Sequence, residues 1–568
     1  MKYQLITFIA GLALLLNSCV DMSLTPLSNA NSEAWYTTEQ ELDMAVNEFY
    51  ILGYWKDPLE NAELWTDNFT YRNTHRTTIL SGTLNGTTAN ENYIVPRLWQ
   101  QSYKLIARAN TLLEKIDGNS VTIPEEKIRQ YKAEAHFARA CKYADLIFFF
   151  GDVVYLDKYI TIDEAFQKGR TPKEEVIPLV YADFDKAIED LPVSYGTKAI
   201  HFTKGAALAM KARFALYMGD WEIASQAAKA CMDLNEYELH SDFADLFLAN
   251  TKNKTKEKIF AIPRSIANSV VLDNWFVSNE RTRNSGGYGS AAPSWDLFAS
   301  FLCTDGLPID KSPLFDPKNP FKNRDPRCTS TIVEFGTEFL GFEYNTHPEA
   351  MEVMNYTTGK MQANQDNRLV NQYASFNGLN WKKGIDEAWT VQGGVECDYV
   401  IMRYADVLLM YAEAKIEQNQ IDNSVVNAIN MVRARGFGVG VSETTRYPAV
   451  TSTNQTELRK TVRLERRVEL AKENRRYMDL IRWRLASKAL NSNNYGIIYP
   501  ATPASITNWF WASTPTIDDD GLVSFKAMED AKQIAVLSVR EWNDRQYLWP
   551  IPVSDIEKCP NLKQNPGY

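Results

Sequence analysis

The chain has 568 residues, 45% of them hydrophobic and 23% charged, and its formal net charge is −10. This is the composition of an ordinary globular protein with one large core or roughly two to three smaller ones. The net negative charge argues against a nucleic-acid ligand, because binding to phosphates requires clustered Lys and Arg.

The N-terminal segment is expected to lie outside the fold. Lys2 precedes an apolar stretch from Leu5 to Leu16, which is followed by Cys19. At about 12 residues the stretch is too short to span a bilayer and reads as a secretion signal. A Cys at the cleavage point resembles a bacterial lipoprotein box, so we predict a signal peptide over 1–18, lipidation of Cys19 and a flexible tether over 19–36. A secretory signal with an incidental Cys is the alternative.

Residues 37–236 are predicted to be helical. Thr171-Pro172-Lys173-Glu174 predicts a helix start, with Thr171 as the cap and Pro172 in the first helical position. Apolar periodicity and capping residues place the helices at 38–52, 93–117, 125–150, 172–190, 203–218 and 221–234.

Two segments of the chain resemble each other. Small residues fall at the same offsets in 212–231 and 412–431. These are the offsets at which the two helices of a tetratricopeptide hairpin must approach closely. We therefore predict a mostly α-helical scaffold of tetratricopeptide-like hairpins, with chance similarity between two helix pairs as the alternative.

Residues 237–400 interrupt this scaffold. They are rich in Gly, Pro, Asn and aromatic residues and show little helical periodicity, so we predict a loop-rich, partly β insertion with short strands such as Lys258 to Ile262. A second irregular region covers 491–530. Loops on a rigid scaffold commonly carry function, so a site is expected in these regions.

The C-terminal region, 401–568, begins with an apolar helix from Arg403 to Ala414. Glu413 in this helix requires a cationic partner, and Arg433 or Arg435 is expected. An arginine-rich helix follows at 459–484 and also contains four acidic residues. Ion pairs within the chain explain it better than an anionic partner.

Six cysteines follow Cys19, with no close pair and no neighbouring His. Cys141 and Cys231 lie in apolar helical patterns, which predicts buried free thiols. A bridge between Cys303 and Cys328 stays open.

The sequence contains no recognisable catalytic or cofactor motif. None of the five His stands at metal-ligand spacing, and there is no nucleophile elbow or phosphate-binding loop. We predict no catalytic residues, no metal and no cofactor. Paired carboxylates for glycoside hydrolysis would be brought together only in space and stay open. Asp518-Asp519-Asp520-Gly521 is interpreted as a solvated loop, with Ca²⁺ binding as the alternative.

A binding function fits the residues better. Sugars require flat aromatic faces beside polar donors and acceptors. Several aromatic residues lie in irregular, polar surroundings, although packing is the alternative role of each. The candidate ligand-binding residues are Trp65, Asp67, Asn68, Arg72, Trp275, Arg281, Tyr288 and Trp381.

Four phrases in order between Arg403 and Tyr568 resemble the SusD/RagB family of nutrient-uptake lipoproteins: 403–414, 430–436, 458–483 and 547–568. The resemblance implies a helical, tetratricopeptide-like fold with a loop-rich ligand surface. It also implies a lipid anchor on the outer face of the outer membrane, an oligosaccharide or polysaccharide ligand, and a TonB-dependent transporter (SusC-like) as partner. Binding residues vary within the family, so none is carried over.

Three other functions remain as alternatives. The protein could be a peptide-binding member of the same family, a structural lid or scaffold that binds only a partner protein, or a glycosidase. The sequence does not name the ligand or the transporter.

Overall fold

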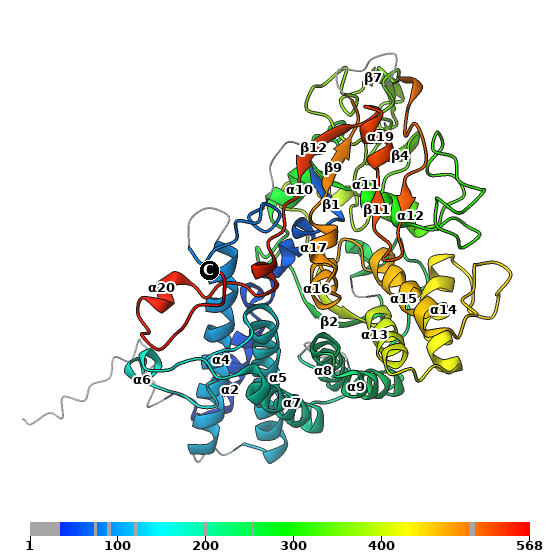
Figure 1. Ribbon diagram of the computed structural model, residues 1–568. Helices are drawn as coiled ribbons and strands as arrows, with labels where there is room; N and C mark the ends of the chain where they lie inside the picture. Colours follow the sequence, from blue (N-terminus) through cyan, green and yellow to red (C-terminus); the bar gives the residue numbers. More distant parts are fainter. Residues whose placement is uncertain are drawn as a thin grey trace, which may run out of the picture.

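The computed structural model describes residues 35–72, 77–87, 93–118, 123–196, 201–252, 254–498 and 506–568. The predicted signal peptide and Cys19 lie outside these residues. In Figure 1 the long helices form one half of the molecule, and the short strands and loops of the insertion form the other.

The N-terminal half contains eight α-helices in the described residues. They are α2 (Glu39–Asn47), α3 (Leu52–Lys56), α4 (Ile94–Gly118), α5 (Glu125–Phe150), α6 (Ile162–Phe166), α7 (Lys173–Asp190), α8 (Lys204–Met218) and α9 (Trp221–Asp233). Five of the six predicted helices are confirmed within a residue or two. The sixth, at 38–52, is divided into α2, a 3₁₀ turn at Glu48–Tyr50 and the start of α3.

The predicted start of α7 is wrong in detail. Pro172, and not Thr171, occupies the N-cap position, and no side chain of that residue accepts a hydrogen bond from the first turn. Thr171 instead exchanges two backbone hydrogen bonds with Val153. The amide of Lys173 donates to the Asp152 carboxylate at 3.0 Å, which supplies the acceptor expected from Thr171.

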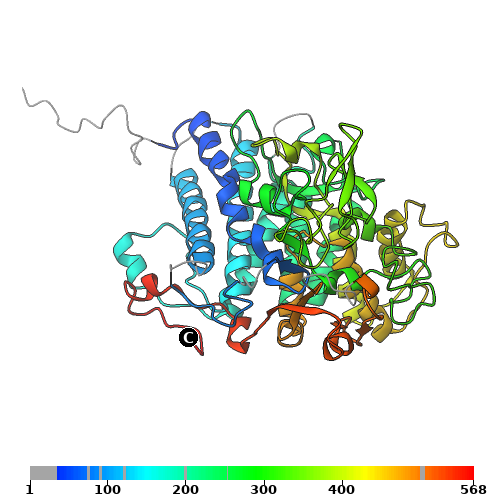
Figure 2. The same ribbon diagram turned by 90° about the horizontal axis from the view of Figure 1, so that it is seen from above.

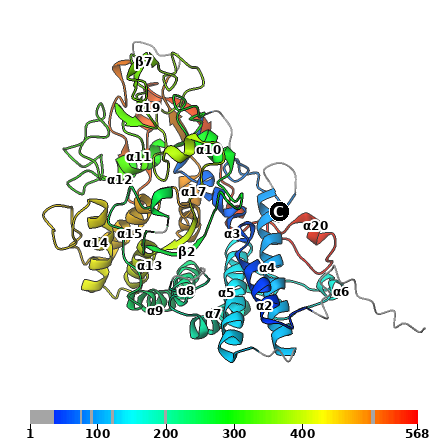
Figure 3. The same cartoon turned by 180° about the vertical axis from the view of Figure 1, so that it is seen from behind.

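The predicted helical hairpins are confirmed. The two resembling segments form α8 with α9, and α13 (Tyr404–Glu417) with α14 (Asn423–Gly436). Ala212, Ala224 and Ala412 are fully buried, as close helix packing requires. Figure 3 shows α7, α8, α9, α13 and α14 following one another along one side of the molecule.

The insertion leaves and rejoins the scaffold through one strand pair, β2 (Lys258–Ile262) with β8 (Tyr399–Arg403), and β2 has its predicted bounds. A second pair, β1 (Phe69–Tyr71) with β3 (Ala291–Pro293), ties the insertion to the N-terminal region. Its helices are α10 (Asn274–Glu280), α11 (Trp295–Ser300) and α12 (Arg327–Thr331), and its four-stranded meander is β4 (Thr337–Phe339), β5 (Phe342–Tyr344), β6 (Glu352–Asn355) and β7 (Lys360–Ala363).

The C-terminal region runs between both halves. Its remaining elements are α15 (Gln455–Glu469), α16 (Arg476–Arg482), α17 (Ala486–Ala489), β9 (Asn493–Gly496), β10 (Thr516–Ile517), β11 (Val523–Ser524), α19 (Lys526–Asp530), β12 (Ala535–Val539) and α20 (Val553–Ile556). The last segment, red in Figure 2, runs along the edge of the molecule. There the amide of Trp549 donates to the carbonyl of Phe149 at the end of α5.

The hydrophobic residues form two cores. The larger lies among the helices of the scaffold. The smaller lies between the insertion, which contributes Trp295 and Phe298, and the C-terminal region, which contributes Trp511. Cys141 and Cys231 are buried free thiols, as predicted, and Cys303 and Cys328 are free as well. No helix in the described part of the chain is long and apolar enough to cross a membrane.

The arginine-rich segment is two helices, α15 and α16, and not one. The chain turns between them, where Lys472 and Asn474 have φ values of 63° and 61°. The predicted intrachain ion pairs are confirmed: the side chains of Arg466, Arg467, Arg476 and Arg482 are at most 6% exposed and are paired with carboxylates.

Glu469 is the centre of the largest buried ion-pair network. Its carboxylate contacts Arg327 of the insertion at 3.0 Å, Arg403 at 2.7 Å and Arg435 of α14. Arg403 and Arg435 also share Glu257. The network therefore joins the insertion, through Arg327, to the start of α13 and to α14.

The expected partner of Glu413 is wrong. Its carboxylate receives two hydrogen bonds of 2.6 Å from Arg482 and one of 2.7 Å from Trp483. Arg433 pairs with Glu465 instead, because α15 lies against α14 and presents Glu465 there.

Replacing Glu469 by Gln should lower the free energy of unfolding by about 3–5 kcal/mol, because it leaves buried arginines without their shared counter-charge. Chemical denaturation measures this. Glu443→Gln, which removes an exposed partner of Arg446, is the control and should leave the free energy of unfolding nearly unchanged.

The pH dependence of stability in the wild-type protein and in Glu469→Gln gives a second test. Burial alone would raise the pKa of Glu469, but Arg435, Arg403 and Arg327 more than offset this and hold the pKa well below its usual range. A lowered folded-state pKa gives stability that is present above the unfolded-state value of about 4.3 and lost as the pH falls below it. The wild-type protein should lose stability more steeply below about pH 5 than Glu469→Gln, and equal slopes would contradict the assignment.

Candidate ligand-binding site

Three of the eight sequence candidates are enclosed in the protein interior. Trp65 is 1% exposed and packs edge-on against Tyr477 and Trp549. Asp67 pairs with Arg467 at 2.9 Å and with Arg476 at 2.8 Å. These contacts give Trp65 and Asp67 a structural role.

Asn68 is fully buried as well. It donates to the carboxylate of Glu63 at 2.9 Å and accepts from Arg467 at 3.0 Å. The side-chain amide of Asn68 is thus engaged by partners inside the protein. Trp65, Asp67 and Asn68 are therefore not part of the candidate site.

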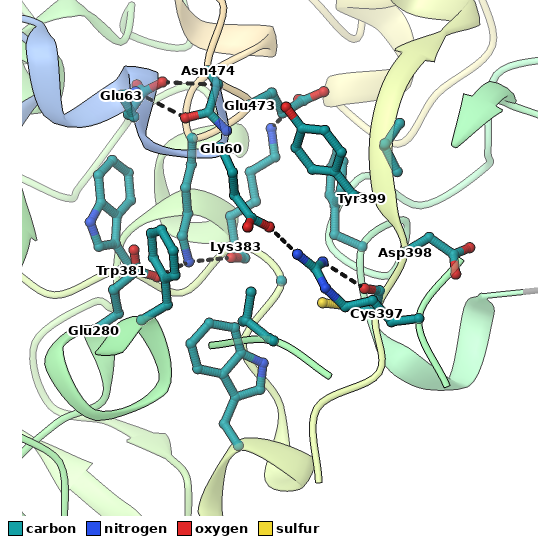
Figure 4. A pocket seen from close by; sticks show the side chains of 18 of the residues that line it. Glu60, Glu63, Glu280, Trp381, Lys383, Cys397, Asp398, Tyr399, Glu473 and Asn474 are labelled. Carbon is teal, nitrogen blue, oxygen red and sulfur yellow. Dashed lines mark hydrogen bonds and ion pairs between the residues drawn. The ribbon is translucent and has the colours of Figure 1, made fainter. Parts of the chain in front are cut away.

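Trp381, 1% exposed, lines a cavity of about 150 Å³ at the junction of insertion and scaffold. Figure 4 shows charged and aromatic side chains, among them Glu60 and Tyr399, facing one another around it. The cavity is smaller than the roughly 300–1,000 Å³ of sites for small organic molecules.

The charges around this cavity are paired within the protein. Lys383 contacts Glu473 at 2.6 Å, and Lys472 contacts Glu280 at 2.7 Å. Burial lowers the pKa of Lys383 to about 8, although Glu473 opposes the shift. We assign the cavity, and Trp381 with it, to the structure of the junction.

Two other candidates, Arg72 and Tyr288, come together on the surface where β1 meets β3, and a third, Trp275, lies beside β1, stacked on Tyr71. The amide of Arg72 donates to the carbonyl of Ser290 at 2.7 Å. The Arg72 guanidinium donates to the carbonyls of Tyr288 at 3.3 Å and Tyr373 at 2.8 Å. Tyr288 is 52% exposed and Trp275 is 39% exposed, so both rings are available to a ligand.

Two residues of this surface were not predicted from the sequence. Tyr373 is 53% exposed, and the guanidinium carbons of Arg72 and Arg283 lie 5.4 Å and 5.9 Å from its ring centre. Arg283 also donates to the carbonyl of Tyr288 at 3.0 Å. An aromatic residue in the polar segment 371–377 was the available signal for Tyr373. We call Arg72, Trp275, Arg283, Tyr288 and Tyr373 the aromatic platform.

Trp275 is held at the start of α10. Asp273 caps this helix by accepting from the Trp275 amide at 2.7 Å. The indole stacks on Tyr71 with ring centres 6.4 Å apart and planes 14° apart. The Tyr71 hydroxyl donates to Asn279 at the other end of α10, so strand β1 and helix α10 fix the ring together.

The guanidinium of Arg281, the last candidate, lies next to Gly286. Its guanidinium donates to the carbonyl of Trp389 at 2.7 Å. This contact ties the loop after α10 to the insertion, which is a positioning role.

The loop at 281–290, which carries Tyr288, is folded back on itself. The amides of Gly287 and Gly289 donate to the carbonyls of Thr282 and Arg281. The buried carboxylate of Asp366 accepts from the amide of Arg283 at 2.7 Å, and burial raises the pKa of Asp366 to about 6. A Cβ at Gly287 would lie 2.3 Å from the carbonyl oxygen of Arg281, so only glycine fits there.

The aromatic platform combines exposed ring faces with two guanidinium groups that can donate hydrogen bonds. Such a surface suits a ligand with apolar C–H faces and hydroxyl groups. Tyr288 and Tyr373 are each more than half exposed, so the rings lie on an open surface.

The acidic turn at 518–520 is engaged by lysines. Lys488 contacts Asp518 at 2.7 Å and Asp520 at 2.6 Å, and Lys460 contacts Asp519 at 2.8 Å. In the described ranges, no group of three or more His, Cys, Asp or Glu is placed to hold a metal ion.

Comparisons with known proteins agree with this fold. Residues 247–568, more than half of the chain, match the SusD family, and residues 21–216 match a family described as "Starch-binding associating with outer membrane". The chain belongs to the SusD family. This membership supports a glycan-binding role.

Individual relatives cover nearly the whole chain. SusD-like protein P2 of Formosa agariphila is 26% identical over 87% of this chain and 93% of its own. A SusD-like carbohydrate-binding protein from Bacteroides fragilis is 27% identical, with a TM-score of 0.74 over 93% of this chain and 99% of that one. A second SusD-like protein from Bacteroides fragilis, 24% identical with a TM-score of 0.73, shares the fold over 95% of this chain and 99% of its own.

Gly287→Ala should displace the loop that carries Tyr288 and lower the free energy of unfolding by about 1–3 kcal/mol, because the new methyl group meets a backbone carbonyl. Hydrogen exchange of the 282–290 amides should become faster. Gly118→Ala, at an open position at the end of α4, is the control and should change neither quantity appreciably. Unchanged exchange in Gly287→Ala would contradict the tight packing of this loop.

Proposed function

We propose that this protein is a cell-surface glycan-binding lipoprotein, which captures an oligosaccharide or polysaccharide and passes it to a TonB-dependent outer-membrane transporter. The aromatic platform carries the proposal. Tyr288 and Tyr373, each more than half exposed, are held beside two guanidinium groups by hydrogen bonds from Arg72 and Arg283 to the backbone.

Capture would use ring faces and hydrogen bonds together. Pyranose rings stack on Trp275, Tyr288 and Tyr373, and their hydroxyls accept from the guanidinium donors of Arg72 and Arg283. Both arginines are already ordered by backbone contacts, so binding costs little additional side-chain entropy. The role is one of binding and not of catalysis, and an open surface allows release to the transporter.

The family and the N-terminal sequence support the proposed anchor and partner. Cys19, which lies outside the described residues, would carry the lipid that holds the protein on the outer face of the outer membrane. The chain is similar to a Bacteroides fragilis protein that is described as a SusD-like carbohydrate-binding protein. This similarity supports the choice of a glycan over a peptide.

Tyr288→Ala, Tyr373→Ala and Trp275→Ala should each weaken glycan binding about 5- to 10-fold, because each removes an aromatic contact of about 1–1.5 kcal/mol. Calorimetric titration with the best glycan ligand measures this. Tyr159→Ala, which removes an equally exposed ring (54%) in the segment before α6, an element far from β1 and α10 in Figure 1, is the matched control. Full affinity in the triple variant would rule out the platform as the site.

Cys19→Ala should move the protein from the outer-membrane fraction to the soluble fraction of cells, because the acyl chains would have no attachment point. Fractionation followed by immunoblotting measures this. Membrane retention of a cleaved Cys19→Ala protein would contradict the lipid anchor.

A further inference from the structure

A second cavity, of about 610 Å³, lies along α15. Its walls are α15, the turn at 306–311 and the acidic turn at 517–521, and Trp483 closes one side. Its volume falls within the roughly 300–1,000 Å³ of small-molecule sites, which the cavity at the junction does not reach. Lys460 and Asp519 at its rim are well exposed, so the cavity opens to solvent.

The lining of this cavity is strongly basic. Five arginines and two lysines line it, against four aspartates. The aspartates are already engaged: Asp518 and Asp520 by Lys488, Asp519 by Lys460, and Asp310 by Lys311. An anion that enters therefore meets no carboxylate without a counter-charge.

Four of the five arginines are paired with carboxylates behind the cavity wall. These pairs are Arg433 with Glu465, Arg459 with Glu417, and Arg467 and Arg476 with Asp67. These ion pairs hold α15 in place, and they weaken the attraction of the four arginines for an anionic ligand.

Arg463 is the exception. Within the described residues it has no hydrogen bond and no ion pair, and its Nε atom is buried without a partner. Its guanidinium carbon lies 4.9 Å from the ring centre of Trp483, which fixes its orientation by a cation–π contact. Burial lowers the pKa of Arg463, Glu413 and Glu417 oppose this shift from beyond ion-pair distance, and the charges of Arg482 and Arg459 add to it. The guanidinium still carries its charge near neutral pH.

A half-buried guanidinium with no carboxylate within ion-pair or hydrogen-bond distance is costly to the fold. A planar, preoriented guanidinium is also the side chain best suited to bind a carboxylate or sulfate through two parallel hydrogen bonds. A bound oxyanion would supply the partner that the protein itself does not provide for Arg463.

We propose that this cavity is a second saccharide site, which takes a sugar unit carrying one carboxylate or sulfate group, with Arg463 as the residue that binds the anion. The proposal rests on the proposed glycan-binding function for the nature of the ligand. It adds that the protein prefers acidic glycans and that this preference resides away from the aromatic platform.

The test is calorimetric titration of wild-type protein with two matched pairs of ligands. The first pair is tri-galacturonate and its methyl ester, and the second is a sulfated galactose trisaccharide and its desulfated form. The wild-type protein should bind at least one acidic ligand at least tenfold more tightly than its neutral counterpart. The pair that shows the difference tells a carboxylate ligand from a sulfate ligand.

Arg463→Gln should abolish this difference and leave the affinity for the neutral ligand unchanged, whereas Arg463→Lys should keep part of it because the charge remains. Arg129→Gln, on the exposed side of α5, is the control and should behave as wild type. Melting temperatures show whether each variant is folded.

The two proposals fail in distinguishable ways. Equal affinity of wild type for acidic and neutral ligands, or an acid preference that survives in Arg463→Gln, overturns the second site. Neutral-ligand binding that survives in the triple platform variant overturns the platform and leaves the Arg463 result standing. Absence of binding to all four ligands overturns the acidic-sugar site.

Discussion

The carboxylate of Glu469 joins three arginines that are distant in sequence. Arg327 belongs to the insertion, Arg403 stands at the junction of β8 and α13, and Arg435 lies on α14. Charges buried this deeply are tolerated only when their geometry is nearly ideal, so the network permits one arrangement of insertion and scaffold. Burial also explains why an arginine-rich segment in an acidic protein is not a surface for nucleic acid. Most of its guanidinium groups lie inside the fold.

The candidate site depends on this arrangement. With the insertion fixed, β3 pairs with β1, and the loop at 281–290 lies against Arg72 of the N-terminal region. The aromatic platform is thus assembled from segments some 300 residues apart, Arg72 and Tyr373 among them. A rigid scaffold that presents loops in this way orders the binding groups before the ligand arrives, which reduces the entropy cost of binding.

The sequence predicted the helices well because apolar periodicity and capping are local signals, and β2 because its apolar run is short and bounded. It did not tell which aromatic residues face solvent. Trp65 and Trp275 stand in similar polar surroundings, yet Trp65 packs on Tyr477 and Trp549, which lie over 400 residues later. The prediction of a partner for Glu413 was wrong for the same reason. Arg482 comes close to Glu413 only because the chain turns between α15 and α16. The family resemblance identified the scaffold, whose motifs are the buried ion pairs, and not the ligand surface.

The most direct test of glycan capture is calorimetric titration of the folded chain, beginning after Cys19, with a panel of plant, host and microbial oligosaccharides and a peptide mixture. The account predicts saturable heat with one class of glycan and none with the peptides. Saturable heat with peptides alone, or no heat across the panel from folded protein, would contradict it.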